Sequence, residues 1–396
     1  MSHLPLYFDN NASTRPYASV IEAMADVMRS NYANPSSTDH AAGAAAAALV
    51  ESSREAIAAS LGARPSEIIF TSGATEANNL AIRGTYFACA SPQKSVIVTA
   101  ATEHPSVLQT LEALRPFGCS PLILSVNCEG RVDLAELREV ISDKVCLVTL
   151  MGANNETGVC HPLRDIGAIC RDKGVPFHSD LTQLAPWREL DMNGLGISLA
   201  SLSAHKMHGP KGVGLLFARG RRPRAKLEPV QSGGGQERAQ RSGTLNTEGV
   251  IGMAAAFAER RTRLAEVGRI SELRTRLEQE LLAIGGVEIN GGEAERAPHT
   301  LNLSIAGVDP HALQHATRRE LVFSTSSACS TEKVANSTVL EAMFGDTERT
   351  RNGFRLGLSH ETTLEDVLFA ARSIATATEH LRSGSIGTIV ATDLVE

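Results

Sequence analysis

Short apolar runs separated by amphipathic stretches run through the first 220 residues of the chain. The apolar runs predict strands at 67–71, 95–99, 122–126, 145–150, 175–178, 197–203 and 213–217. The stretches between them predict helices, for example over 41–61, 76–86 and 162–172. Strands that are apolar throughout are typical of a sheet buried on both faces, so the pattern predicts a mostly parallel sheet covered by helices on both sides.

The pattern changes after residue 247. A long helical stretch over 247–284 leads to strands at 299–305, 322–325 and 353–358 and to helices at 310–320 and 363–382. Strands and helices are less regularly alternated here, which favours a small α+β domain. We therefore predict a large α/β domain over 15–260 and a small domain formed by 1–14 together with 261–396.

Polar residues follow four strands in succession. They are His104 after 95–99, Asn155 within 152–158 after 145–150, Asp180 and Gln183 after 175–178, and Lys206 after 197–203. Ligands of such sheets bind at the carboxyl ends of the strands. Each residue taken singly fits a turn, a helix cap or a surface histidine. Four of them around one lysine indicate a binding site.

Lys206 stands in the sequence Ser203-Ala-His-Lys-Met-His-Gly-Pro-Lys-Gly-Val-Gly214. A lysine at the end of a buried strand is partly desolvated, which lowers its pKa and frees its amine for imine formation. Ser203 and His205 are hydrogen-bond donors that suit an anion such as phosphate. The turn 72–75 between a strand and a helix fits a second anion site, because unpaired N–H groups and the helix dipole meet there, and it equally fits a simple helix cap.

Composition narrows the function classes. The chain of 396 residues is 42% hydrophobic and carries a net charge of −6, which argues against nucleic-acid binding by charge. No signal peptide and no apolar run of about 20 residues is visible, so we expect a cytoplasmic protein. The basic run 219–226 fits a solvated hairpin tip better than a docking patch. His205 and His208 lack the spacing of a metal site.

The seven cysteines form no Cys-x2-Cys pair, which disfavours disulfides and zinc. Cys146 lies in an apolar strand and is expected to be a small core residue. Cys329 lies among small polar residues, in 324–333, and is predicted to be the one cysteine with the exposed setting that a reactive thiol needs.

Several of these segments together resemble the motifs of the cysteine desulfurases, which use pyridoxal 5′-phosphate (PLP). The matching segments are 72–80, 102–104, 154–159, 180–183, 203–212, 241–244 and 326–329. The resemblance covers 7–365 and is closest to the longer-loop group, which includes the iron–sulfur-cluster and nitrogenase enzymes. It implies the fold type I of PLP-dependent transferases, with a seven-stranded, mostly parallel sheet in the large domain.

The resemblance also implies the cofactor contacts. Lys206 would hold PLP as an imine, Asp180 would pair with the ring nitrogen, and Gln183 would bind the ring hydroxyl. His104 would stack on the ring and move protons. The phosphate would be held by Ala74, Thr75, Ser203 and His205, and by Thr244 reaching the neighbouring subunit, so a homodimer is expected.

The substrate implied is L-cysteine. Asn155, Arg355 and Asn34 would bind it, with Arg355 forming a two-pronged salt bridge to the carboxylate. The Cys329 thiolate would attack the substrate sulfur, release L-alanine and keep a persulfide. A sulfur-acceptor protein of iron–sulfur cluster assembly, tRNA thiolation or DNA phosphorothioation would then take that sulfur. No metal ligands are implied, apart from a contact of the persulfide with a cluster.

The chain departs from the family pattern at three places. It has Ser326-Ser327 where a glycine usually precedes the Ser-Ala-Cys motif, Ser359-His360 in place of Gly-Arg, and a different stretch over 332–336. These changes point to a dedicated acceptor. Alternative functions are another class V PLP enzyme, such as a selenocysteine lyase or aminotransferase, or a relative that has lost catalysis. Intact Lys206 and Cys329 disfavour the last.

Overall fold

The computed structural model describes residues 5–89, 91, 93–220, 226–325 and 336–384. Its larger sheet has seven strands, in the order β2-β8-β7-β6-β5-β3-β4. All neighbouring pairs are parallel except those of β8, which runs against β2 and β7. The predicted α/β class and mostly parallel seven-stranded sheet are confirmed. The strands are β2 (Ile68–Thr71), β3 (Val96–Ala100), β4 (Ser120–Leu124), β5 (Val145–Thr149), β6 (Phe177–Asp180), β7 (Leu199–Ser203) and β8 (Gly214–Ala218).

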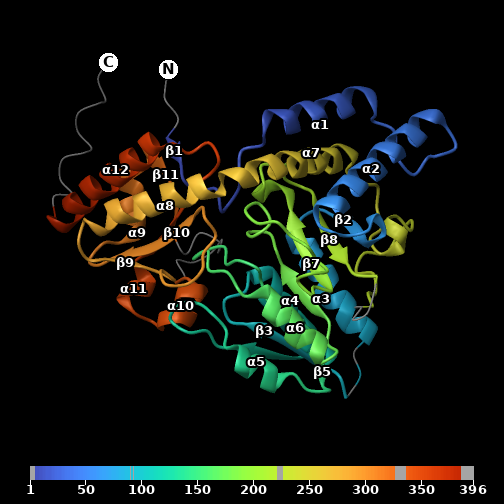
Figure 1. The fold of residues 1–396 in the computed structure, drawn as a ribbon, viewed down its shortest axis with the longest axis horizontal. Coiled ribbons are helices and arrows are strands. Elements are labelled where there is room, and N and C mark those ends of the chain that lie inside the picture. Colours follow the sequence, from blue (N-terminus) through green and yellow to red (C-terminus); the bar gives the residue numbers. More distant parts are fainter. Residues whose placement is uncertain (1–4, 90, 92, 221–225, 326–335, 385–396) are drawn as a thin grey trace.

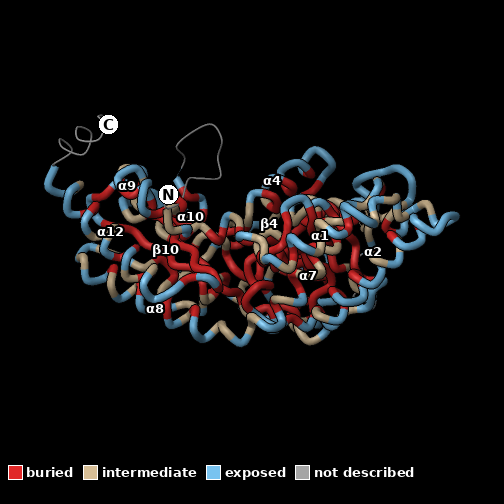
Figure 2. Tube along the Cα trace, turned by 90° about the horizontal axis from the view of Figure 1, so that it is seen from above, coloured by how far each residue is buried: buried red, intermediate tan, exposed pale blue. Residues whose placement is uncertain are grey.

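Alternating side chains of these strands enter two apolar cores. In β2, Ile68 and Phe70 join one core while Ile69 joins the other. Helices α3 (Ala74–Cys89) and α4 (Pro105–Leu114) cover the face of Ile69. The opposite face is covered by α2 (Ala41–Ser60), α5 (Leu134–Val140), α6 (Leu163–Asp172) and α7 (Thr247–Arg263), with α1 (Ala18–Ser30) against α7. Figure 2 shows the buried interior between exposed outer helices.

A second, antiparallel sheet has the order β12-β13-β10-β9 and its own core. Its strands are β9 (Val287–Ile289), β10 (Thr300–Ile305), β12 (Ser324–Thr325) and β13 (Gly353–Gly357). Helices α8 (Val267–Leu282), α9 (Pro310–Thr317) and α12 (Leu364–Arg382) pack together on it, beside the larger sheet in Figure 1. Two further short helices are α10 (Thr338–Phe344) and α11 (Glu348–Arg351).

The N-terminal segment lies with the C-terminal part of the chain. Strand β1 (Leu6–Tyr7) pairs in parallel with β11 (Leu321–Val322), and Phe8 packs in the core of the second sheet. Residues 9–13 then continue towards the larger sheet, where Thr14 bonds to His205. The proposed domain boundaries, with 1–14 and 261–396 together, stay a prediction.

The single helix predicted over 247–284 is two helices. A short 3-10 turn, Leu264–Glu266, separates α7 from α8. Side chains three residues apart eclipse one another in such a turn, and here Arg263 and Glu266 form an ion pair of 2.6 Å. Across the described residues, no helix is both long and apolar enough to cross a membrane.

Candidate active site

A cavity of about 570 Å³ lies at the carboxyl ends of the larger sheet. Its lining comes from the ends of β2, β3, β5, β6 and β7, from the N-terminal segment, and from β10, β12 and β13 of the smaller sheet. The predicted site residues that line it are Ala74, Thr75, His104, Asn155, Asp180, Gln183, Ser203, His205, Lys206 and Arg355. The strand-end pattern in the sequence thus marks one common cavity.

Lys206 ends the 3-10 turn that follows β7. Its ammonium nitrogen Nζ donates to the carbonyl oxygens of Asn11 at 2.6 Å and Ala12 at 2.7 Å. The same Asn11 oxygen accepts from Nε2 of Gln183 at 2.9 Å. The Asn11 peptide, which lies 195 residues before Lys206, therefore holds two predicted site residues side by side.

A hydrogen-bonded chain connects Asp180 with His104. The amide nitrogen of Asn78, on α3, donates to Asp180 Oδ2 and to Ser106 Oγ, both at 2.8 Å. Ser106 Oγ lies 2.8 Å from Nδ1 of His104, and the Ser106 backbone N–H donates to the same ring nitrogen at 3.1 Å. Because Nδ1 is an acceptor, a neutral His104 carries its proton on Nε2.

The histidines of the cavity are neutral at physiological pH. Burial lowers the pKa of His104, and Asp180 opposes that effect while Lys206 adds to it. Burial, together with the charges of Lys206 and Lys211, lowers the pKa of His205 to about 4. An imidazole that stays neutral can accept a proton, whereas one held protonated cannot.

The α3 end of the cavity, defined here as Ser72–Thr75 with Ser203 and His205, follows from a close packing of backbone. A Cβ at Gly214, the first residue of β8, would lie 2.6 Å from the Cα of Gly73 and 2.5 Å from the Leu202 oxygen. Only glycine lets β8 pass beneath the turn. The first residues of α3, Ala74 and Thr75, line the cavity and place the positive end of the helix dipole there.

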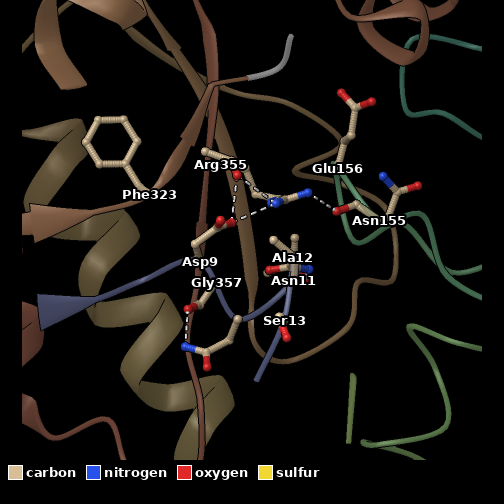
Figure 3. Close-up of polar contacts among 12 residues, drawn as sticks. Asp9, Asn11, Ala12, Ser13, Asn155, Glu156, Phe323, Arg355 and Gly357 are labelled. Carbon is tan, nitrogen blue, oxygen red and sulfur yellow. Dashed lines mark hydrogen bonds and ion pairs between the residues drawn. The ribbon is translucent and has the colours of Figure 1, made fainter. Parts of the chain in front are cut away.

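The opposite end, the Arg355 end, is assembled from Asp9, Asn155, Ser324 and Arg355 (Figure 3). Arg355 is buried on β13. Its Nη2 donates to Asp9 Oδ1 at 2.8 Å and to Ser324 Oγ at 3.0 Å, and its Nη1 donates to the Asn155 carbonyl at 2.8 Å. No role was predicted for Asp9, Asn11 or Ser324. The available signal for Asp9 and Asn11 was the polar segment 9–13, which directly follows the short apolar run 6–8.

Two predicted residues of the described part of the chain are not in the cavity lining. Thr244 and Asn34 are exposed, and Asn34 caps its own turn through a bond from the Ser36 N–H. Cys329 lies outside the described residues. Thr325, four residues before it, lines the cavity.

The prediction that no other cysteine has an exposed, loop-like setting is wrong, because Cys128 is exposed in the turn after β4. Four other cysteines are buried. Burial raises the pKa of Cys119 and Cys160 to about 11 and of Cys146 and Cys170 to about 12, so these four thiols stay protonated and unreactive at neutral pH. Cys146 is a core residue, as predicted.

Comparison with known proteins identifies the family. Residues 6–368 match the "Aminotransferase class-V" family. The chain is 41% identical over 384 residues to "Cysteine desulfurase IscS" of Anaeromyxobacter sp. (strain Fw109-5), covering 96% of this chain and 94% of that protein.

Solved structures agree with the sequence relatives. A "NIFS-LIKE PROTEIN" superposes with a TM-score of 0.88 at 33% identity, over 95% of this chain and all of that one (100%). "SspA in complex with cysteine" does so with a TM-score of 0.79 at 31% identity, over 89% of this chain and 98% of that one. The chain therefore belongs to the class-V aminotransferase family and, within it, to the cysteine desulfurases.

Proposed function

We propose that the chain is a PLP-dependent enzyme that converts L-cysteine to L-alanine and leaves the sulfur as a persulfide on Cys329. The observation that carries the proposal is one cavity that combines these groups. On one side lie the amine of Lys206, the buried carboxylate of Asp180 and the start of α3. On the other side lies the buried guanidinium of Arg355. These groups match a cationic ring with a phosphate, bound next to an amino-acid carboxylate.

The residues present fit PLP. Lys206 supplies the amine, and both Asp180 oxygens are held in place, Oδ2 by Asn78 and Oδ1 by the Thr182 N–H at 3.0 Å. A fixed anionic carboxylate would keep a pyridine nitrogen protonated. The α3 end offers helix N–H groups and the hydroxyls of Thr75 and Ser203 to a phosphate. Bound PLP would supply an electron sink for the bond broken at the substrate Cα.

Side chains of the protein would transfer protons and bind the substrate. His104, neutral with Nδ1 acting as an acceptor, would face the ring and exchange protons with the substrate thiol. Arg355 and the Asn155 amide would orient the L-cysteine carboxylate. Four extended residues span at most about 14 Å, so Cys329 would lie within that distance of Thr325 at the cavity.

In the sulfur transfer, the Cys329 thiolate would attack the sulfur of L-cysteine. The S–S bond would form as the substrate C–S bond breaks, the electron pair of that bond would return to carbon, and a proton would complete L-alanine. A sulfur-acceptor protein, in iron–sulfur cluster assembly, tRNA thiolation or DNA phosphorothioation, would take the outer sulfur.

We further propose a cytoplasmic homodimer. Thr244 ends an exposed, glycine-rich loop and Asn34 lies on a second exposed loop. Both are placed outside the cavity of their own chain, which supports a role at the site of a neighbouring subunit. Sedimentation of the wild-type holoenzyme would test the dimer. A monomer with full activity would contradict it.

Replacing Cys329 tests the reaction. Cys329→Ala should abolish L-alanine release from L-cysteine while the visible absorbance of the cofactor remains. Cys128→Ser, which changes the exposed cysteine of the turn after β4, should keep full activity and serves as the matched control. Full activity of Cys329→Ala would refute the desulfurase assignment and favour an aminotransferase or a selenocysteine lyase. A wild-type protein without visible absorbance would indicate a non-catalytic relative.

A further inference from the structure

Asp9 is an acidic group in a place where an anionic substrate group is expected. It follows β1, and its Oδ1 accepts from Arg355 Nη2 at 2.8 Å and from Ser324 Oγ at 2.6 Å. Arg355 Nη2 also donates to Ser324 Oγ at 3.0 Å, so the three side chains close a triangle. Their exposed fractions are small, 8% for the Arg355 side chain and 18% for that of Asp9.

Counting donors shows what this triangle does to Arg355. A guanidinium has five N–H groups. Nη2 donates to both Asp9 and Ser324, whose accepting oxygens lie 2.6 Å apart, and one hydrogen of Nη1 is used by the Asn155 carbonyl. One Nη1 hydrogen is left, together with Nε–H, which is buried and has no partner among the described residues.

A two-pronged pair with a carboxylate needs neighbouring N–H groups, either Nη1 with Nη2 or Nε with Nη2. Both edges include Nη2, which the triangle holds at Asp9 and Ser324. A carboxylate that enters while the triangle persists can meet the remaining hydrogen of Nη1. The Asn155 side chain, which also lines the cavity, is the donor available for its second oxygen.

We propose that Asp9 is a positioning residue for Arg355, fixing Nη2 through the Asp9–Ser324–Arg355 triangle so that Nη1 and Asn155 together receive the substrate carboxylate. This inference rests on the proposed function for the identity of the substrate.

A competing carboxyl group explains why the positioning is needed. Glu156, next to Asn155, also lines the cavity (Figure 3). Burial raises the pKa of Glu156, while a hydrogen bond from Ser337 and the positive charge of Arg355 oppose that rise. Without Asp9, Glu156 would be the remaining carboxyl group at this end whose charge interacts with that of Arg355.

Equilibrium binding of two probes to the holoenzyme tests the proposal, with the visible band of the cofactor as the readout. L-Alanine has the carboxylate and L-alaninamide lacks it. Asp9→Ala should weaken L-alanine binding about 10-fold, as expected for loss of one charged hydrogen bond, and leave L-alaninamide within about twofold. Asp9→Asn, which keeps an oxygen acceptor for Nη2, should weaken the binding of L-alanine less than Asp9→Ala does.

If Asp9 had only a general structural role, Asp9→Ala would weaken the binding of both probes equally, and that result would overturn the proposal. Unchanged or tighter binding of L-alanine would overturn it as well. Asp346→Asn is the matched control, since Asp346 pairs with Arg351 in the same part of the chain but both side chains are exposed. It should change neither probe. Failure of the proposed function is seen separately, as a wild-type holoenzyme that releases no L-alanine from L-cysteine.

Discussion

The two ends of the cavity are built in different ways. The α3 end comes mainly from one continuous segment, 68–89, which forms β2, the turn and α3, and is completed by Ser203 and His205 at the end of β7 and just after it. Its groups are mainly backbone N–H groups and hydroxyls, fixed by local geometry. The Arg355 end brings together Asp9, Asn155 and Ser324, which lie 346, 200 and 31 residues from Arg355 along the chain.

The difference also concerns charge. At the α3 end the helix dipole attracts an anion without burying any full positive charge. At the Arg355 end a full guanidinium charge is buried and needs a partner, which Asp9 supplies at 2.8 Å. Local sequence can therefore specify most of the first end, whereas the second depends on the whole fold bringing opposite charges together.

The largest effect is expected from removing the buried charge at the Arg355 end. Arg355→Ala should lower kcat/KM for L-cysteine at least about 100-fold, because the substrate carboxylate loses its cation. It should also lower the free energy of unfolding by about 3–5 kcal/mol, because Asp9 is left unpaired. Urea denaturation and steady-state kinetics measure the two effects.

A double variant sharpens this prediction. Asp9→Ala combined with Arg355→Ala should regain part of the lost stability, because no unpaired charge remains, but none of the lost activity. Additive losses of stability in the double variant would contradict the pairing of these two residues.

An intermediate effect is expected from crowding the α3 end. In Gly214→Ala the new methyl group would meet the Gly73 backbone at 2.6 Å, so the turn must move. We expect a loss of about 1–3 kcal/mol of stability and a lower cofactor content, measured by the visible absorbance. Gly268→Ala, on α8 with open space around it, is the control and should be neutral or slightly stabilising. A Gly214→Ala variant with normal cofactor content would argue against this cradle.

The smallest effect is a dependence of stability on pH. Burial lowers the pKa of His161, His178, His205 and His360 to about 4, whereas unfolded histidine titrates near about 6.5. Between these values the unfolded chain binds more protons, so stability should be complete above about pH 6.5 and fall as the pH drops towards 4. Glu156 acts in the opposite sense, because its raised pKa favours protonation in the folded state.

Urea midpoints at pH 7.5, 6 and 5 would measure this dependence. In His205→Gln the urea midpoint should fall less between pH 7.5 and 5 than in the wild type, because one of the imidazoles with a lowered pKa is gone. Identical midpoints at all three pH values would refute the explanation.

Much of the fold could be predicted from the sequence, because local hydrophobic patterns specify its strands and helices. The strand ends of β3, β5, β6 and β7 predicted His104, Asn155, Asp180 and Lys206 as one site, since parallel strands bring their carboxyl ends to the same edge. The short helices α10 and α11 were missed. The break between α7 and α8 was also missed, although Gly268 lies just after it.

By itself, the sequence determined the α/β class, the site at the strand ends, the chemistry of Lys206 and the resemblance that singles out Cys329. Only the tertiary structure showed that Asn11 is hydrogen-bonded to Lys206 and Gln183, and that Asp9 pairs with Arg355. The physical reason is the pairing of β1 with β11, which carries a segment from the start of the chain between the two sheets. No periodicity or motif near residue 9 encodes a partner 346 residues away.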